Sequence, residues 1–308
     1  MAKNPTAGGG EKDPPRIIDI AYPRQDELVV HLLGTRPLYH HSMSPEAMRE
    51  LLYPSPRKNE AAKAASMKHN PLKEYRESPY VAVGDHHPAR LLMRADALKK
   101  ALGTAALETA GVFKSEIGRA VYVQPDTGIY LYIWGKPVLS METVRMSGIQ
   151  RVPDIRTRAV CVEWCARARI KFLADRFSDK AIANLVALAG MVSGWGDARQ
   201  EKGARSEGLW QIVNADNEDW QRIARTQGRA VQDAALETPE FLDHDSEALY
   251  TWFVEEVERR GRRDKAATGP ATISTRPRTN GSGDAVAQAA LIHEVASGRA
   301  GKRRSATQ

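Results

Sequence analysis

The 308-residue chain contains little that supports redox or disulfide chemistry, because it has only two cysteines. Cys161 and Cys165 lie four residues apart in a segment with strand-like alternation, so both should sit on one strand and point to one face. They are poorly placed to bridge each other and too few for a structural zinc site. We therefore expect two reduced thiols and no metal site.

Long hydrophobic runs and common catalytic motifs are also missing. No run of 18 or more apolar residues occurs, and residues 1–12 are glycine-rich and charged where a signal peptide would have an apolar core. This predicts a cytoplasmic protein without a membrane partner. The chain has no P-loop, GxSxG, HExxH or dinucleotide-binding motif. The sequence therefore implies no cofactor and favours a protein that is not an enzyme.

Positive charge is abundant but unevenly placed. The formal net charge is +7, and residues 262–308 alone hold nine basic and three acidic residues, so the rest of the chain is almost neutral. Residues 262–308 also have too few apolar groups to fold alone, which predicts a disordered basic tail. Residues 1–16, which lack hydrophobic periodicity, are expected to form a disordered arm.

Residues 160–213 have the clearest pattern in the chain. Apolar residues at the even positions predict one long half-buried strand: Val160, Val162, Trp164, Ala166, Ala168, Ile170 and Phe172. Ser178 and Asp179 can cap a following helix, whose apolar stripe contains Ile182, Leu185, Val186 and Ala189. A loop with glycines at 190, 194, 196, 203 and 208 then leads to a strand over residues 209–213.

The remaining segments complete a mixed fold. We expect a first strand at 27–33, a long insertion at 35–90, a helix at 94–110, a hairpin of 119–123 with 129–134, and helices at 217–236 and 246–260. In the last helix, Leu249, Trp252, Phe253 and Val257 should face inward. The predicted fold is α+β: a ferredoxin-like or RRM-like antiparallel sheet with helices on one face. Residues 17–213 would form this domain, and residues 214–261 a C-terminal helical extension.

This strand order, the basic insertion after the first strand, and the loop from Gly194-Trp195-Gly196-Asp197-Ala198-Arg199 through Gly203 and Gly208 resemble the RAMP superfamily. These are ferredoxin-like RNA-binding proteins that include the backbone subunits of CRISPR effector complexes. The resemblance covers roughly residues 27–213 and implies an RNA-binding role in an assembly. A phage-encoded single-strand-binding protein has a similar outline.

Two groups of residues are candidates for nucleic-acid binding. Arg167, Arg169 and Lys171 are spaced two apart, so they share one strand face, where they would follow a single-stranded backbone. In the loop, Arg199, Lys202 and Arg205 accompany Trp195, which would either stack on a base or fill the core. For the strand group, an ordinary solvent-facing strand is the alternative.

Three functions remain open at this point. The leading hypothesis is a protein that binds single-stranded RNA or DNA and assembles along it, as a homo-oligomer or within a larger nucleoprotein complex. The first alternative is a metal-independent ribonuclease that uses His40, His41, His86 or His87 as general acid or base. The second is a non-enzymatic interaction subunit that docks through the helix at 246–260 and the tail.

Overall fold

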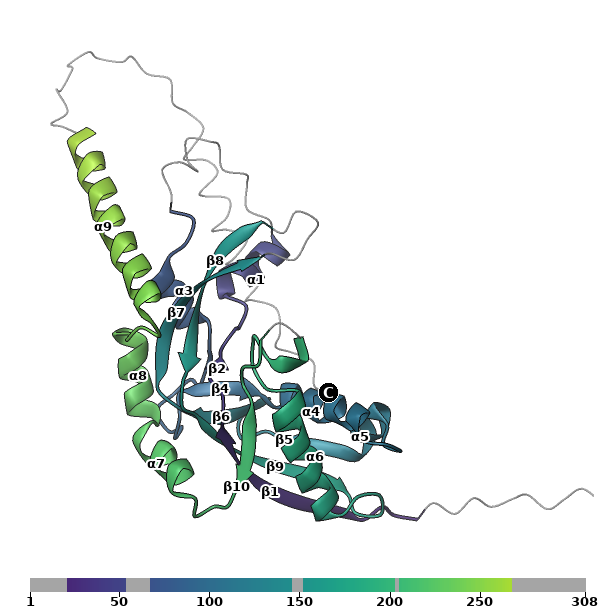
Figure 1. The fold of residues 1–308 in the computed structure, drawn as a ribbon. Coiled ribbons are helices and arrows are strands. Elements are labelled where there is room, and N and C mark those ends of the chain that lie inside the picture. Colours follow the sequence, from purple (N-terminus) through teal and green to yellow (C-terminus); the bar gives the residue numbers. More distant parts are fainter. Residues whose placement is uncertain (1–20, 54–66, 146–151, 203–204, 268–308) are drawn as a thin grey trace, which may run out of the picture. The chain divides into compact units, whose positions relative to one another are not determined.

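The computed structural model describes residues 21–53, 67–145, 152–202 and 205–267, which form a seven-stranded and a three-stranded antiparallel sheet with surrounding helices (Figure 1). One compact unit extends to Glu255 and a second begins at Glu256. The predicted arm at 1–16 and the predicted tail beyond residue 267 lie outside the described residues. The first residues of that predicted tail, up to Ala267, belong to a helix.

The large sheet has a ferredoxin-like core. In chain order its elements are β1 (Gln25–Gly34), α4 (Ala95–Ala105), β5 (Val121–Gln124), β9 (Cys165–Leu173), α6 (Asp179–Val192) and β10 (Trp210–Val213). In space β10 pairs with β1, β1 with β9, and β9 with β5, all antiparallel. This is the β-α-β-β-α-β arrangement with its fourth strand beside its first. The predicted fold class is confirmed.

Further strands enlarge this core and build the second sheet. The large sheet continues beyond β9 through β6 (Tyr130–Trp134), β4 (Leu91–Arg94) and β3 (Tyr80–Val81). The small sheet contains β2 (Leu38–Tyr39), β8 (Pro153–Cys161) and β7 (Pro137–Arg145). The insertion supplies β2, β3 and the short helices α1 (Pro45–Leu52) and α3 (Pro71–Glu77). Its basic residues Arg57, Lys58 and Lys63 fall outside the described residues.

The single strand predicted for residues 160–172 is two strands in two different sheets. β8 ends at Cys161 in the small sheet, and β9 begins at Cys165 in the large one. Val162, expected inside, lies in the turn between them and is 51% exposed. The alternating pattern holds for β9 itself, from Ala166 to Phe172. The two cysteines therefore lie on different strands, both free and buried, and burial raises the pKa of Cys165 to about 12.

The predicted hairpin is also wrong in its pairing. A turn does follow β5, where Asp126 N donates to Tyr130 O. However, β5 and β6 do not pair with each other, because both lie along the same edge of β9. β5 is opposite residues 169–172 of β9, and β6 is opposite residues 165 and 166. The backbone of β9 therefore pairs with both β5 and β6, and these two strands run in the same direction.

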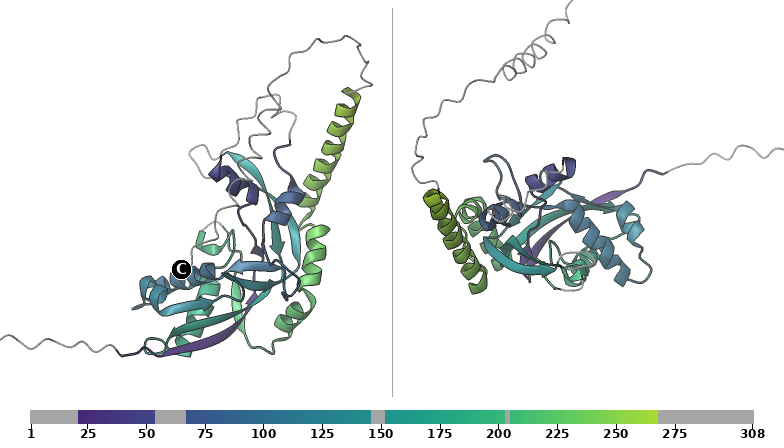
Figure 2. Two further views of the ribbon diagram at one scale, coloured as in Figure 1. Left: turned by 180° about the vertical axis from the view of Figure 1, so that it is seen from behind. Right: turned by 90° about the horizontal axis from the view of Figure 1, so that it is seen from above.

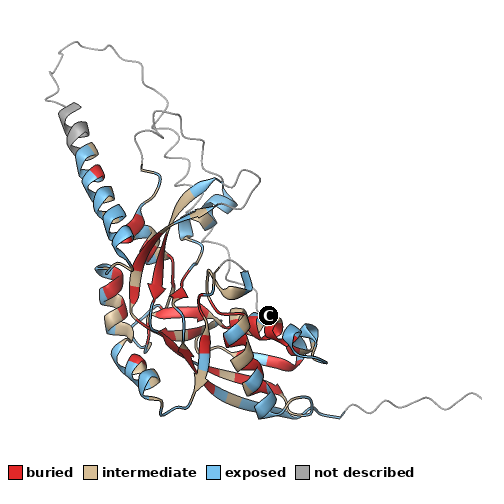
Figure 3. Cartoon of the chain, in the orientation of Figure 1, coloured by how far each residue is buried: buried red, intermediate tan, exposed pale blue. Residues whose placement is uncertain are grey.

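Helices cover the large sheet unequally on its two sides. α4, α6 and α5 (Lys114–Ala120) lie on one side and bury the main core (Figures 1 and 2). Two short 3-10 helices come after them in the chain: η1 (Ala106–Glu108) follows α4, and η2 (Gln200–Lys202) follows α6. As predicted, Ser178 caps α6 by accepting from Ala181 N, and the apolar stripe of α6 faces this core. Figure 3 shows the buried residues concentrated in the strands and on the inner faces of these helices.

The C-terminal extension consists of three helices. They are α7 (Glu218–Thr226), α8 (Arg229–Glu237) and α9 (His244–Ala267), and Gly228 divides the first two, which the sequence predicted as one helix. In α9, Leu249, Trp252 and Val257 were expected inside but are exposed, with Trp252 at 59%. Tyr250 faces the core in their place and packs against Phe241. The stripe that contacts the core is therefore displaced around the helix from the predicted one.

Candidate nucleic-acid interface

The three basic residues of β9 lie together on one face of the large sheet. Their neighbours Ala166, Ala168, Ile170 and Phe172 are buried beneath α4 and α6. Because successive side chains of a strand point to opposite sides, Arg167, Arg169 and Lys171 face away from these helices. We call this side of the large sheet the open face. The predicted alternation places these residues there correctly, although their binding role stays a prediction.

The register fixes what surrounds each basic residue. Arg167 is opposite His31 of β1, and Lys171 is opposite Glu27 of β1 and Tyr122 of β5. Tyr122 is 53% exposed, so its ring is available on the surface. Directly opposite residues in an antiparallel pair share a face at a Cβ separation of about 5 Å. The open face therefore combines positive charge with exposed aromatic surface.

Acidic neighbours offset part of this charge. Lys171 Nζ lies 3.7 Å from Glu27 Oε2, and Arg169 lies 3.8 Å from Asp126 Oδ1. Burial raises the pKa of Asp126, although a hydrogen bond from Tyr132 N and the nearby arginines oppose the shift. Within the part of the chain that the structure describes, Arg167 forms no ion pair. Arg167 is thus the residue of the three best placed to neutralise a phosphate.

Six aromatic rings extend from beside Arg167 along the open face, and we call them the ring row. Successive centroids lie 4.7 Å apart for His31–Trp220, 6.1 Å for Trp220–Trp134, 6.2 Å for Trp134–Tyr132, 5.7 Å for Tyr132–His87 and 3.9 Å for His87–His86. Of these, only the two histidines of the insertion were singled out from the sequence. The alternation of Tyr130, Tyr132 and Trp134 with aliphatic residues in β6 is a signal that would have found two more.

The ring row is held in place by hydrogen bonds and by α7. His87 Nδ1 lies 2.6 Å from Tyr132 Oη, and Trp220 Nε1 donates to Ala166 O at 3.3 Å. α7 packs Ile223 over Leu33 and Cys165 and so covers one end of the open face. Burial lowers the pKa of His31, and nearby Arg167 lowers it further, so this ring is neutral at neutral pH.

The glycine-rich loop lies elsewhere, against the small sheet. Asp197 N donates to Tyr39 O of β2, and Gly208 N donates to Pro37 O. Trp195 is 1% exposed and meets Trp164 edge to face at 6.2 Å. Its ring therefore fills the core, which is the alternative that the sequence left open. Gly203 lies outside the described residues.

The basic residues of the loop are mostly engaged with the protein itself. Arg199 forms an ion pair with Glu201 at 3.0 Å. Arg205 forms one with Glu142 at 2.6 Å and lies over the Tyr39 ring. Lys202 ends η2 and is exposed. Arg199 and Arg205 therefore stabilise the loop through contacts within the protein.

The histidines that were weighed as catalytic groups have different surroundings. His40 is completely buried, and burial lowers its pKa to about 4. His41 lines a pocket with Asp197. His86 and His87 end the ring row on the open face. Among the described residues, no cluster of three or more histidine, cysteine, aspartate or glutamate side chains is arranged to hold a metal ion.

Comparison with known proteins adds little to this geometry. No family model and no curated protein matches the chain. Among solved structures, the chain is similar to one in a cryo-EM structure of the type III-B Cmr-beta complex bound to cognate target RNA. The identity is 14% and the TM-score 0.33, and the match covers 62% of this chain and 59% of the other. Separately, none of the helices in the described residues is both long and apolar enough to span a bilayer.

Proposed function

We propose that the protein binds single-stranded nucleic acid, RNA or DNA, across the open face of its ferredoxin-like sheet. The observation that carries this proposal is the position of Arg167, Arg169 and Lys171 beside the ring row. Alternate residues of a strand lie about 6.7 Å apart, so the three charges form a regular line along β9. Cationic side chains that follow the backbone, together with rings that stack on bases, are the two requirements of sequence-tolerant single-strand binding.

The structure also supports a preference for single strands over duplexes. Stacking on the ring row requires the flat face of a base, which base pairing and stacking within a duplex conceal. Bases of a single strand can be splayed out onto a sheet, as in other sheet-based binders of this fold class. The proposal leaves the choice between RNA and DNA open, because no partner for a 2′-hydroxyl group is defined by these residues.

Fluorescence anisotropy with the full-length protein tests this proposal. Labelled single-stranded RNA, single-stranded DNA and duplex oligonucleotides of the same mixed sequence are titrated at several salt concentrations. We expect both single strands, or one of them, to bind more tightly than the duplex, with an affinity that falls as salt rises. Affinity that is absent, or that does not change with salt, contradicts the proposal.

A pair of charge-reversal variants separates the open face from overall charge. Arg167→Glu should weaken binding at least tenfold and reduce the logarithmic salt slope by about 0.7, the value for one phosphate contact on a single strand. Lys180→Glu makes the same change in net charge on α6, on the other side of the sheet. It should bind almost as well as the unmodified protein. Equal losses in the two variants would assign the binding to overall charge.

A further inference from the structure

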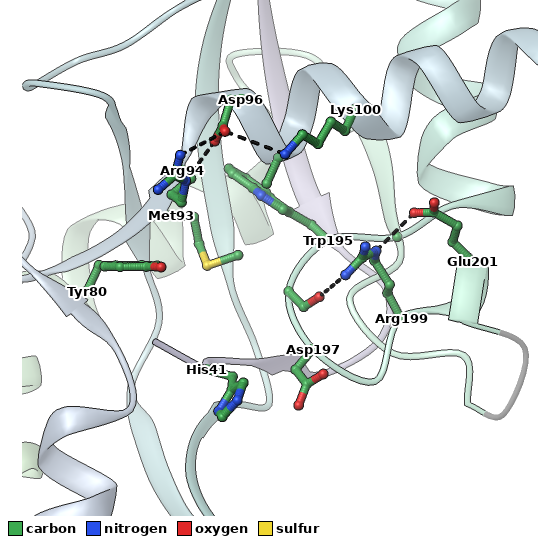
Figure 4. Close-up of a pocket in the computed structure, with 13 residues that line it drawn as sticks. His41, Tyr80, Met93, Arg94, Asp96, Lys100, Trp195, Asp197, Arg199 and Glu201 are labelled. Carbon is green, nitrogen blue, oxygen red and sulfur yellow. Dashed lines mark hydrogen bonds and ion pairs between the residues drawn. The ribbon is translucent and has the colours of Figure 1, made fainter. Parts of the chain in front are cut away.

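A pocket of about 290 Å³ lies between the start of α4 and the glycine-rich loop (Figure 4). β3 and β4 contribute Tyr80 and Met93, α4 contributes Lys100, and the loop contributes Trp195 and Arg199. This volume is close to the lower limit of about 300 Å³ for ligand sites in proteins. The pocket therefore suits one compact ring system better than an extended ligand.

One of the residues that line this pocket has an unused hydrogen-bond donor. Trp195 is 99% buried, yet its Nε1 has no hydrogen-bond partner among the described residues. Buried polar groups in proteins are nearly always paired, so such a donor calls for an explanation. The other two buried indoles of this core are satisfied, because Trp164 Nε1 donates to Arg36 O and Trp210 Nε1 donates to Val186 O. Trp195 alone of these three lines the pocket.

The charges around the pocket cancel within the protein. Asp96 accepts two hydrogen bonds from Arg94, each at 2.9 Å, and Lys100 lies 3.7 Å from the same carboxylate. Arg199 pairs with Glu201, and Asp197 pairs with Arg158 at 2.6 Å. Burial lowers the pKa of His41, so its ring is neutral at neutral pH.

Three basic and three acidic side chains thus line the pocket, each engaged with a partner of opposite charge. A phosphate would find no uncompensated positive charge there. A neutral ligand suits this lining better if it has flat apolar faces for Met93 and the Tyr80 ring. Its edge would need an acceptor for the Trp195 indole N–H. Nucleobases have this combination.

The pocket also adjoins the surface proposed to bind the strand. The Tyr80 ring, which lines the pocket, lies 5.1 Å from the Tyr130 ring of β6. Tyr130 lies two residues before Tyr132 on the same strand, so its side chain projects from the side of β6 that carries the ring row. A strand that crosses the open face toward β4 therefore comes close to the Tyr80 ring, which lines the pocket.

We propose that this pocket receives one unstacked nucleobase of the bound strand, with Trp195 Nε1 donating a hydrogen bond to the edge of the base. The inference rests on the proposed function, to which it adds a subsite that contacts a base instead of the backbone. Stacking on Tyr80 accounts for most of the affinity of this subsite, because base–aromatic stacking is the stronger of the two interactions.

NMR of the tryptophan indole groups tests the pocket without a strand. The chain has six tryptophans, and the Trp195→Phe variant identifies the Trp195 indole signal in the full-length protein labelled with ¹⁵N. Titration with each of the four nucleoside 5′-monophosphates should shift this signal, as a new hydrogen bond does. Ribose 5-phosphate, which has the sugar and phosphate but no base, should leave it in place. The signal of exposed Trp252 is the internal control.

The outcomes separate the subsite from the proposed function. A Trp195 signal that moves neither with any monophosphate nor with an oligonucleotide that binds overturns the subsite and leaves the function intact. An equal shift with ribose 5-phosphate also overturns it, because the ligand is then an anion. A shift with monophosphates in a protein that binds no oligonucleotide supports the base pocket but refutes strand binding.

Two tyrosine variants provide a second, independent measurement. Tyr80→Ala should reduce monophosphate affinity about tenfold, since it removes a stacking ring from the pocket. Tyr122→Ala removes a ring from the open face and should weaken oligonucleotide binding while leaving monophosphate affinity unchanged. Thermal unfolding of both variants checks that each is folded. Unchanged monophosphate affinity in folded Tyr80→Ala contradicts the assignment.

Discussion

At the scale of single residues, His40 is the buried group with the clearest link to pH. Its side chain is fully enclosed beside Cys161, with 3.7 Å between His40 Nε2 and Cys161 Sγ. Burial disfavours the imidazolium and lowers the pKa of His40 from 6.5 to about 4. The folded protein therefore holds this ring neutral at pH values where the unfolded chain has already protonated it.

This difference predicts a loss of stability in acid. Because the pKa of His40 is lower in the folded state, its contribution to stability is fully present above pH 6.5 and is lost as pH falls toward 4. A shift of this size corresponds to a change in the free energy of unfolding on the order of 3 kcal/mol. Urea unfolding at a series of pH values should show this loss for the wild type and a smaller one for His40→Gln.

The matched control is His86→Gln, which removes an exposed imidazole. It should retain the full acid sensitivity of the wild type. If His40→Gln loses as much stability between pH 6.5 and 4 as the wild type does, other groups cause the acid sensitivity, and His40 is not the titrating residue.

The position of the Trp195 ring could not be decided from the residue type alone. A tryptophan between two glycines in a basic loop fits both a surface stacking ring and a core side chain. The backbone of Gly208 passes so close to Trp195 that a Cβ at residue 208 would lie 1.8 Å from Trp195 O. The Trp195 ring itself packs against Trp164 in the core. The close approach of Gly208 joins segments thirteen residues apart, which no local pattern reveals.

At the scale of elements, two helix glycines differ sharply in their surroundings. A Cβ at Gly190 of α6 would lie 2.2 Å from Trp210 O of β10, whereas a Cβ at Gly118 of α5 would meet nothing within 4 Å. α6 therefore approaches the edge strand more closely than any other residue type permits. At Gly118 only the low helix propensity of glycine matters.

The same substitution should consequently have opposite effects at these two positions. Gly190→Ala should lower the free energy of unfolding by about 2 kcal/mol, since overpacking forces α6 away from β10. Gly118→Ala should raise it by about 0.5 to 1 kcal/mol through helix propensity. Chemical denaturation midpoints measure both effects. A Gly190→Ala protein as stable as the wild type would contradict the close contact of α6 with β10.

The strands show how far local patterns predict the elements. β1, β9, α4 and α6 follow from hydrophobic period, and their order along the chain, together with the strands expected at 119–123 and 209–213, predicts the ferredoxin-like core. The change of sheet between Cys161 and Cys165 is different, because the sequence keeps apolar residues at the even positions across the turn. Trp164 is buried, and its Nε1 donates to Arg36 O of a distant segment. The hydrophobic period of a segment cannot predict a contact with a distant segment.

The candidate surfaces likewise are predictable from the sequence only where their residues lie in one segment. The basic line on β9 is predictable because its three residues lie within a single strand. The pocket beside α4 was not predicted, since its walls come from residues 41, 80, 93–100 and 194–201. Likewise, the ring row combines the insertion, β1, β6 and α7. Only the fold brings these segments together.

At the scale of the whole molecule, the distribution of charge separates two contributions to binding. Residues 262–308 hold nine basic and three acidic residues, whereas the preceding residues are almost neutral. On the open face, Glu27 and Asp126 offset part of the charge of β9. We therefore predict that the unit ending at Glu255 sets the path of a bound strand, and that the basic residues of the tail add attraction that depends little on geometry.

Assembly along a strand also belongs to this scale and stays a prediction. If copies bind side by side, light scattering after size-exclusion chromatography should show complexes whose mass rises with oligonucleotide length. The same measurement distinguishes assembly on nucleic acid from an oligomer that exists without it.

Deletion of residues 268–308 tests the division of charge between the tail and the sheet. Six basic and two acidic residues are removed, so affinity for a single strand should fall and the logarithmic salt slope should flatten by up to about 0.7 for each phosphate that the tail no longer neutralises. Replacing Arg167, Arg169 and Lys171 together with alanine should instead abolish the ordered complex, because these residues sit on a rigid strand. An unchanged salt slope after the deletion would show that the tail neutralises no phosphate. Ordered binding retained by the triple-alanine protein would place the strand somewhere other than on β9.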